Sequence, residues 1–517
     1  MKRSPIQSYL SGEDAMLRLA GGALDGAHLD AARKAGELAP EVRFDLVATV
    51  EAQYLRSGLK SPSMLEHLLD PTSRTVTAGH QLVLATGPAF SIYKALTAVA
   101  LAEHLAERWG TPVVPVFWLA SEDHDFEEIR TLEAGADGQQ FSWDGPEDMR
   151  GGRWPVGRMP VEGVSEVLAS FGEAAALPEA WSAGLRDDLL DEQGELRSLA
   201  DAFRRWMHRA LGDVPIVVLD ADAEKLKRHF APIMGRELKG QGIEAAVLRA
   251  NADLEKAGFK PQAHVRPVNL FEFRGGERVR VEAVGEPLGG GKGARVRPEN
   301  FSPNALLRPM YQRAILPDVA TVGGPSETGY WLQLREAFSS AGWRMPVLVP
   351  RHSCTVLTPK LAQLAQQLEL NNEDLLAGRT ELERRLVTEK MPEHWETQRR
   401  LLVGWIGQTV GVAADVDPGL DQAAQGMGAR INKEFDKLEQ KLRRAVKQQA
   451  SVTVGRLERW SEGVAPGGRP QERVHNYFEL AAAWNPDDLG ALSVEILSAI
   501  RDSIARDFAP EQHVIQP

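Results

Sequence analysis

The fold is decided by the stretch TVTAGHQLVLATGPAFSIYKALTAVALAEHLAERWGTPVVPVFWLASEDHD, residues 75–125. Residues 75–81 begin with β-branched side chains, residues 89–109 keep apolar side chains at helical spacing, and residues 112–120 are almost unbroken apolar sequence. An apolar run of that length is typical of a strand that is buried on both faces. Strand, helix and buried strand together predict a βαβ unit, the first part of a Rossmann-like parallel α/β sheet.

Two polar segments follow these strands, at the edge where an open α/β sheet binds its ligands. The first is Thr86-Gly87-Pro88, which precedes the helix. We expect the start of that helix to present unbonded N–H groups and the positive end of its dipole to an anion. Lys94 lies two turns further on, so His80, Thr86 and Lys94 are predicted to contact phosphate or carboxylate.

The second polar segment is Glu122-Asp123-His124-Asp125, directly after the buried strand. Three interpretations stay open: a solvated helix-capping loop, an acid or base that contacts the substrate, and a transition-metal site. Three well-spaced ligands are not evident, so no metal site is predicted. Residues 122–125 and Lys94 are the candidate catalytic residues.

Later segments extend the same core. Residues 215–222, 319–322 and 345–351 are predicted strands, and residues 264–283 are a predicted β-hairpin with Gly275-Gly276 at its turn. Residues 286–302 are rich in glycine and contain Lys292, but they lack the spacing of a P-loop. We expect a loop there that touches an anion.

Two helix starts are predicted in the second half of the core. Ser302-Pro303 is expected to cap the helix 304–315. The turn Gly323-Gly324-Pro325-Ser326-Glu327 follows a strand, and Ser326 is expected to cap the next helix. Glu327 and Tyr330 would lie in the first turns of that helix, at the same edge of the sheet as the first two polar segments.

The remaining sequence is predicted to be helical. Residues 418–462 contain no proline after Pro418, and Ile431, Phe435, Leu438 and Leu442 recur at coiled-coil spacing, with residues 382–411 as the antiparallel partner. We expect Ile406, Val410, Phe435 and Leu442 to leave an apolar stripe that joins two subunits in a homodimer. The predicted domains are a helical wrapping at 1–70, the core at 71–378 with insertions at 130–211 and 225–300, the coiled-coil hairpin at 379–462, and a helical segment at 463–517 that packs back on the core.

Composition narrows the functional class. The formal net charge of −12 argues against nucleic acid as a partner, since phosphate backbones require a basic face. Cys354 is the single cysteine, so an intramolecular disulfide is excluded and a reducing compartment is indicated. No run of eighteen apolar residues occurs, so a membrane span is not expected and a cytoplasmic protein is predicted.

Four segments of the chain resemble a known family. They are AGHQLVLATGPAFSIYKA (78–95), PVFWLASEDHDFEEI (115–129), LLRPMYQRAILPDVATVGGPSETGYWLQL (306–334) and RPQERVHN (469–476). In this order, over nearly the whole chain, they are similar to the BshC family of cysteine ligases in bacillithiol biosynthesis. The resemblance implies binding roles for residues in these segments and nearby: His80, Gln81, Thr86, Gly87, Tyr93, Arg308, Gly323, Gly324, Ser326, Glu327, Tyr330, Trp331 and Arg351.

The resemblance also implies a reaction, the addition of L-cysteine to the amine of glucosaminyl-malate. A free carboxylate must be activated before it forms an amide, so ATP is expected, with Mg²⁺ as its counter-ion and either an adenylate or an acyl phosphate as intermediate. Arg308 and Arg351 would bind the malate carboxylates. Three rival functions remain: a nucleotidyltransferase that stops at an activated intermediate, a non-catalytic coiled-coil scaffold with a degenerate core, and a metal-dependent hydrolase acting through residues 122–125.

Overall fold

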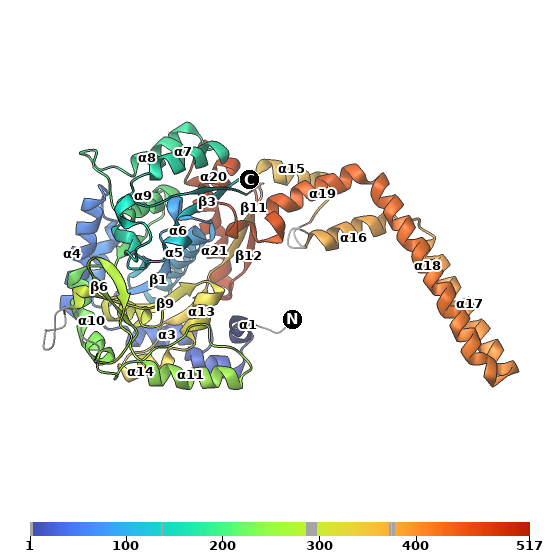
Figure 1. Ribbon diagram of the computed structural model, residues 1–517, viewed down its shortest axis with the longest axis horizontal. Helices are drawn as coiled ribbons and strands as arrows, with labels where there is room; N and C mark the ends of the chain where they lie inside the picture. The colour runs from blue at the N-terminus through green and yellow to red at the C-terminus, as the bar shows by residue number, and fades with distance from the viewer. Residues whose placement is uncertain (1–3, 136–137, 286–296, 372–373, 375–377) are drawn as a thin grey trace. The chain divides into compact units, whose positions relative to one another are not determined.

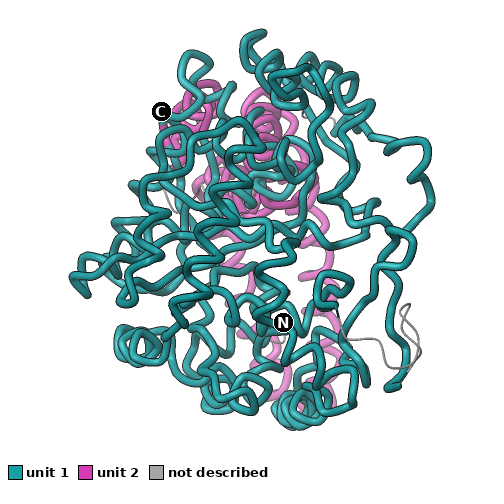
Figure 2. Tube along the Cα trace, turned by 90° about the vertical axis from the view of Figure 1, so that its left-hand side faces the viewer, with its two compact units in different colours: residues 1–356, 471–515, 517 teal, residues 357–470, 516 magenta. Residues whose placement is uncertain are grey.

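The computed structural model describes residues 4–135, 138–285, 297–371, 374 and 378–517. The chain forms two compact units (Figure 2). Unit 1 comprises residues 1–356, 471–515 and 517, and unit 2 comprises residues 357–470 and 516. The units therefore divide at 356 and 470, whereas the sequence placed the boundaries at 378 and 462. Residues 471–476 belong to unit 1, where Gln471 and Glu472 bond to β11 (Ser353–Val356) and Asn476 bonds to the loop after β1 (Arg74–His80).

A five-stranded parallel sheet lies at the centre of unit 1 (Figure 1). Its strand order is β10-β9-β1-β2-β5, and every neighbouring pair is parallel. The chain runs outward from β1 through β2 to β5, then returns to β9 on the other side of β1, so the topological switch point lies between β1 and β9. The predicted Rossmann-like sheet is confirmed, with strands β1 Arg74–His80, β2 Val113–Leu119, β5 Val217–Asp220, β9 Asp318–Gly323 and β10 Val347–Pro350.

Both faces of the sheet are buried, which explains the unbroken apolar runs. In β2, Val113, Phe117 and Leu119 pack into one hydrophobic cluster, while Val116 and Trp118 pack into a second one. Helices of the first cluster are α3 Gly26–Ala35, α5 Phe90–Trp109, α7 Val164–Ala174, α8 Glu179–Asp187, α9 Leu199–Leu211, α20 Tyr477–Trp484 and α21 Ala491–Arg506. Helices of the second cluster are α1 Pro5–Leu10, α2 Asp14–Ala20, α4 Pro40–Arg56, α10 Glu224–Glu237, α11 Glu244–Lys256, α12 Arg308–Ile315, α13 Pro325–Trp331 and α14 Arg335–Ser340.

The smaller sheets lie in the connections between the core strands and where the C-terminal segment pairs with β11. The expected hairpin is present, with Gly275-Gly276 at its turn. These elements are α6 Phe126–Ile129, the pair β3 Thr131–Ala134 and β4 Gln139–Ser142, the sheet of β6 Leu270–Arg274, β7 Glu277–Arg280 and β8 Phe301–Pro303, and the parallel pair β11 Ser353–Val356 and β12 Gln512–Ile515. Residues 286–296, which include Lys292, lie outside the described residues.

Two predicted helix caps are wrong. Ser302-Pro303 belongs to β8, which pairs with β6, and α12 begins only at Arg308. Strand pairing uses the backbone that the sequence had assigned to a helix start. Ser326 is exposed and makes no capping bond, because Gly324 is the N-cap of α13 and Pro325 is its first residue.

Unit 2 consists of helices: α15 Pro359–Gln367, α16 Arg379–Glu389, α17 Trp395–Val416, α18 Asp421–Gln449 and α19 Ser451–Val464. The expected antiparallel hairpin is formed by α17 and α18, while the helix predicted for 418–462 divides at Ala450. Within the part of the chain that the structure describes, no helix is long and apolar enough to cross a membrane.

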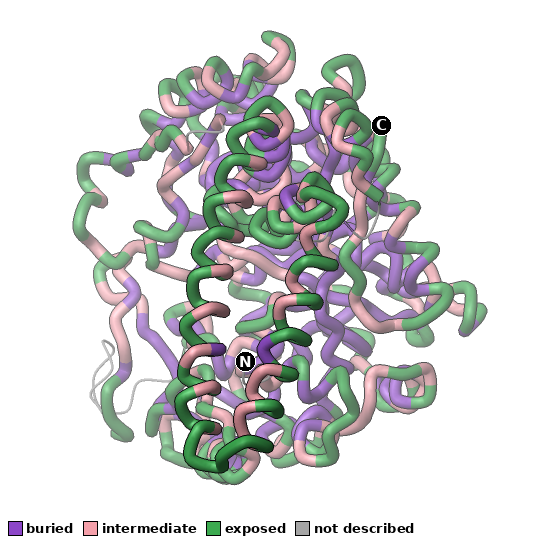
Figure 3. The backbone as a smooth tube through the Cα atoms, turned by 90° about the vertical axis from the view of Figure 1, so that its right-hand side faces the viewer, coloured by how far each residue is buried: buried purple, intermediate pink, exposed green. Residues whose placement is uncertain are grey.

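The apolar stripe of the hairpin differs from the predicted one. Ile406 is buried against α18, and Phe435 stacks on Trp395 with 4.6 Å between ring centroids, so both close the hairpin itself. Most residues of α17 and α18 are exposed to solvent (Figure 3). A different set of apolar side chains faces outward from α17. These are Leu401, Trp405, Val412 and Val416, which follow one another at intervals of four, seven and four residues and are 51–76% exposed.

Candidate active site

The loop between β1 and α5 has an unusual backbone. Ala85, Thr86 and Gly87 have consecutive positive φ values of 44°, 65° and 69°. Such a conformation persists only where the surroundings hold it. Asn476 does so from the C-terminal segment, because its Nδ2 donates to the carbonyl oxygens of Ala85 and Gly87 at 2.9 Å each.

Replacing Gly87 tests this loop. Gly87 has φ 69° and ψ −154°, a region open almost only to glycine, and an added Cβ would lie 2.7 Å from Cβ of Val83. We expect Gly87→Ala to lower the free energy of unfolding of unit 1 by about 3 kcal/mol, measured by urea denaturation. Gly110→Ala is the control, since Gly110 has an ordinary left-handed conformation with open space around it and should lose only about 1 kcal/mol. Equal losses in the two variants would contradict the argument.

The start of α5 does not offer the predicted row of free donors. The N–H of Ala89 donates to the carbonyl of His475 at 2.9 Å, and those of Ser91 and Ile92 donate to Pro88 and Ala89. Thr86 is fully buried in the loop. The expected free donors are therefore not available, because the returning C-terminal segment covers the start of α5, and phosphate binding there stays a prediction. Thr86 and Gly87 shape the loop instead.

A cluster of charged side chains lies at the switch point, and we call Lys94, Arg308, Glu327 and Tyr330 the switch-point cluster. The Nζ of Lys94 donates to Oε2 of Glu327 at 2.8 Å and to the carbonyl of Gly79, the penultimate residue of β1, at 2.9 Å. The guanidinium of Arg308 lies 3.5 Å from Oε1 of Glu327 and donates to the hydroxyl of Tyr330 at 3.3 Å. Two cations thus flank one carboxylate, which leaves the switch-point cluster itself with a net positive charge and suited to an anion.

The residues around this cluster have different surroundings. His80 ends β1 and its ring packs edge-on against Phe90. Burial, with Lys94 and Arg351 nearby, lowers the pKa of His80 well below its usual value, so its imidazole is neutral. The other predicted binding residues at this edge are Gly323, which ends β9, Gly324, whose backbone approaches Lys94, and Tyr93 and Trp331, which are buried in the two hydrophobic clusters.

The carboxyl ends of β2 and β5 carry a second, largely buried group. Lys227 of α10 lies 2.8 Å from Oε1 of Glu122 and 2.6 Å from Oδ1 of Asp222. Burial raises the pKa of Glu122 to about 7, with Asp222 adding to the rise and Lys227 opposing it. A carboxyl with such a pKa exchanges its proton near neutral pH, as a general base must.

Asp123 and His124 are held by an arginine from the second insertion. Nη1 of Arg278, on β7, lies 3.1 Å from Oδ1 of Asp123 and 3.0 Å from Nδ1 of His124. Arginine has no acceptor, so Nδ1 of His124 must accept and its proton lies on Nε2. Gln81 donates to the other carboxylate oxygen of Asp123 at 2.7 Å. Although burial opposes it, Arg278 and Gln81 lower the pKa of Asp123, which keeps this carboxylate charged.

Arg351 is not available for a substrate carboxylate, contrary to prediction. It forms a two-pronged ion pair with Glu472 in which both side chains are 4% exposed. Glu472 also accepts the N–H of Cys354, and Gln471 bonds both backbone groups of Val356. The segment 471–476 therefore ties β11 and the strained loop together. At these contacts the residues of the family motif have a structural role, not a role in binding substrate.

Sequence reasoning missed several residues of this edge. Lys227 lies five residues after Asp222, which itself follows the end of β5, a position that could have marked it as a partner for the acids there. Arg278 gave no signal, because its position in a hairpin 154 residues after His124 says nothing of what it contacts. Asp125 caps α6 through the N–H of Glu128, as the capping interpretation of residues 122–125 expected. Within the described ranges, no group of three or more His, Cys, Asp and Glu side chains is placed to hold a metal ion.

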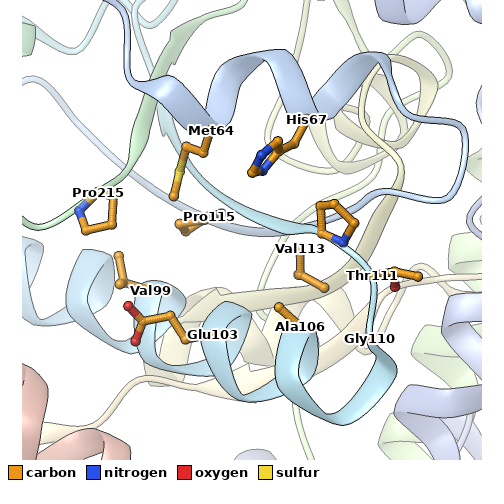
Figure 4. Close-up of a pocket in the computed structure, with 11 residues that line it drawn as sticks. Met64, His67, Val99, Glu103, Ala106, Gly110, Thr111, Val113, Pro115 and Pro215 are labelled. Carbon is orange, nitrogen blue, oxygen red and sulfur yellow. The ribbon is translucent and has the colours of Figure 1, made fainter.

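A hollow of about 390 Å³ lies elsewhere, at the amino end of β2 (Figure 4). Val113 and Pro115 of β2, Val99 and Glu103 of α5, and Met64 line it. Glu103 is bonded to Arg501. None of the predicted binding residues lines this hollow, since they gather at the opposite, carboxyl edge of the sheet. The candidate active site is therefore the switch-point cluster with its neighbours at the ends of β2 and β5.

Comparison with known proteins covers almost the whole chain. The family model described as "Bacillithiol biosynthesis BshC, N-terminal Rossmann-like domain" matches residues 9–288 and 291–352. The model described as "Bacillithiol biosynthesis BshC, C-terminal coiled-coil domain" matches residues 354–499. Curated relatives carry the name "Putative cysteine ligase BshC": one from Cytophaga hutchinsonii is 31% identical over 88% of this chain and 87% of its own length, and one from Symbiobacterium thermophilum is 30% identical over 82% of each.

Proposed function

Because the chain belongs to the BshC family of bacillithiol biosynthesis, we propose that it is a ligase that joins the carboxylate of L-cysteine to the amine of glucosaminyl-malate. The observation that carries this proposal is the switch-point cluster, in which Lys94 and Arg308 present two cations at the carboxyl edge of a Rossmann-like sheet. Both substrates bring carboxylates to the site, and the net positive charge of the switch-point cluster stabilises them. With Arg351 paired to Glu472, Arg308 is the arginine we assign to the malate group.

ATP would supply the leaving group that turns the cysteine carboxylate into an acylating agent. The residues that fit a phosphate or an activated carboxylate are Lys94 and Arg308, whereas the start of α5 does not, because its donors are bonded. No residue is assigned to the adenine or to Mg²⁺. In this proposal Lys94 holds the reacting carboxylate of cysteine and stabilises the negative charge that develops on it, while Arg308 holds the malate group of the second substrate.

The acids at residues 122 and 123 have different properties, which assigns them different roles. Asp123 remains charged and is 31% exposed, so it suits the ammonium group of cysteine. Glu122, with a pKa of about 7, suits removal of the proton from the attacking amine. His124 is a poor base in this arrangement, since its Nδ1 faces a donor and its Nε2 carries the proton.

The pH dependence of the rate tests the role of Glu122. A general base must be ionised, so kcat/KM should rise with pH through about 7 as the Glu122 carboxyl loses its proton. We expect Glu122→Gln to lower kcat/KM at pH 8 by about a hundredfold and to remove this rise. Glu128→Gln is the matched control, because Glu128 is a neighbouring carboxyl whose pKa burial also raises. If kcat/KM still rose with pH in Glu122→Gln but no longer did so in Glu128→Gln, the general base would be Glu128 and not Glu122.

The reaction itself is tested by incubating the protein with cysteine, glucosaminyl-malate and ATP, and by mass spectrometry of the products. The proposal expects the new amide together with AMP or ADP. Pyrophosphate without an amide would indicate the nucleotidyltransferase function instead. Turnover without ATP that chelators abolish would indicate metal-dependent hydrolysis. The cytoplasm, as the compartment of such a reaction, stays a prediction.

We also propose that unit 2 joins two subunits into a homodimer through α17. Leu401, Trp405, Val412 and Val416 place four exposed apolar side chains on one face of this helix. An apolar stripe of this kind is stabilised when a second copy covers it. The coiled-coil family model supports the assignment of this region.

Sedimentation tests the dimer. We expect the wild type to sediment as a dimer at micromolar concentration and Trp405→Asp with Val412→Asp to sediment as a monomer, because a charge in the centre of an apolar interface is left unpaired. Leu248→Asp is the control, since Leu248 is 52% exposed on α11 of unit 1. A wild-type monomer, or a dimer that persists in the double variant, would contradict the proposal.

A further inference from the structure

A chain of hydrogen bonds leads from Arg308 into the interior of unit 1. Nη1 of Arg308 donates to Oε1 of Gln312 at 2.9 Å, one turn along α12. The Nε2 of Gln312 donates to Oδ2 of Asp318 at 2.5 Å. Gln312 is 1% exposed and Asp318 is 3% exposed, so neither has an alternative partner in water.

Asp318 is fixed at the far end of this chain. It is the first residue of β9, and its Oδ1 accepts the hydroxyls of Thr75 and Thr77 on β1 at 3.2 and 2.8 Å. One oxygen of this carboxyl is therefore held by hydroxyls of β1 and the other by Gln312 of α12. Asp318 lies at the amino end of β9 and not at the carboxyl edge of the sheet. We therefore expect it to affect substrate binding only through Gln312.

The orientation of the Gln312 amide follows from its partners alone. Arginine has five donors and no acceptor, so the group facing Arg308 must be the amide oxygen. The amide nitrogen then faces Asp318, which can accept it. Burial raises the pKa of Asp318 to about 7, yet this orientation holds for either protonation state, because Arg308 is a donor in both.

We propose that Gln312 and Asp318 are positioning residues that aim the guanidinium of Arg308 at the anionic group of the substrate. The inference rests on the proposed function, in which Arg308 binds the malate carboxylates. Arg308 otherwise bonds only through Nη2, to Tyr330 at 3.3 Å and to Glu327 at the longer distance of 3.5 Å, as far as the described residues show. The bond to Gln312 is the shortest of the three and comes from the most buried partner, so it sets the position of the guanidinium.

Two single substitutions interrupt this series of hydrogen bonds at different points. Gln312→Met keeps the length of the side chain and removes the acceptor for Arg308. Asp318→Asn acts less directly: the threonine hydroxyls keep the remaining oxygen, so the new NH₂ group faces Gln312. The Gln312 amide must then turn its oxygen inward and present its own NH₂ group to Arg308, a contact between two donors.

The experiment compares the wild type, the two single variants and their double variant. Binding of glucosaminyl-malate is measured by titration calorimetry, and the position of Arg308 is read from ligand-free crystal structures. We expect each single variant to bind about tenfold more weakly, with a displaced guanidinium. The double variant should bind no more weakly than Gln312→Met, because Asp318 acts only through Gln312.

A control separates positioning from general damage to the core. Gln333→Met makes the same change at another fully buried glutamine, which bonds Asn251 and the carbonyl of Ala263. It should lower stability in urea denaturation and leave affinity unchanged. Wild-type affinity in Gln312→Met, an unmoved Arg308, or additive losses in the double variant would overturn the inference. If the wild type does not bind glucosaminyl-malate, the proposed substrate is wrong, and the position of Arg308 in the variant structures alone decides the inference.

Discussion

Replacing Lys94 by alanine is expected to lower kcat for amide formation by a hundredfold to a thousandfold, on the order of what loss of one preorganised donor does in other enzymes. The Nζ of Lys94 is held by Glu327 and by the carbonyl of Gly79, and its side chain is 7% exposed. It is therefore placed before the substrate arrives and needs no reorganisation during the reaction. Removing it also leaves Glu327 as a carboxylate that repels the anionic reacting group.

A second substitution distinguishes the two parts of this effect. Adding Glu327→Gln to Lys94→Ala removes the repulsion but does not restore the cation, so we expect a partial recovery of kcat, about tenfold. Lys256→Ala is the control, because Lys256 is a surface lysine that pairs with Asp253 on the same helix. The measurements are steady-state rates, with circular dichroism to confirm that each variant is folded. Wild-type turnover in Lys94→Ala would contradict the role assigned to Lys94.

The strands of the core were predictable because each is an apolar run with a turn signal at its end. Residues 112–120 have the pattern of a strand buried on both faces, and β2 is such a strand, because it lies between β1 and β5 within the sheet. Local pattern fails where distant backbone competes for a segment. Ser302-Pro303 has the sequence of a helix cap, yet pairing with β6 makes it a strand.

The candidate site was predictable only in part, since sequence identifies which strand ends carry polar residues but not how those residues pair. Lys94 and Glu327 come from segments 233 residues apart, and both were predicted, but their ion pair was not. Arg351 and Glu472 show the opposite outcome. Both lie in or beside segments that suggested ligand contacts, and the structure places them against each other in the interior. Charge in a sequence motif does not distinguish a binding residue from a buried pair.

That buried pair leads to the largest expected effect on stability. Glu472→Ala should lower the free energy of unfolding of unit 1 by about 3–5 kcal/mol, because it leaves the guanidinium of Arg351 buried without its counter-charge. The N–H of Cys354 also loses its acceptor, and the segment that covers the start of α5 loses an anchor. The effect is measured by urea denaturation of the full chain.

The matched control is Glu103→Ala, which removes the carboxylate from an equally two-pronged pair with Arg501. In that pair the side chains are 37% and 47% exposed, so water replaces the lost partner and the loss should stay within about 1 kcal/mol. If Glu472→Ala lost no more stability than this control, the structural role of Arg351 would be contradicted and the arginine could bind an anion. Arg351→Lys distinguishes the two roles. A structural arginine cannot be replaced by lysine, because lysine cannot form the two-pronged pair, so the free energy of unfolding of the variant falls before any substrate is added.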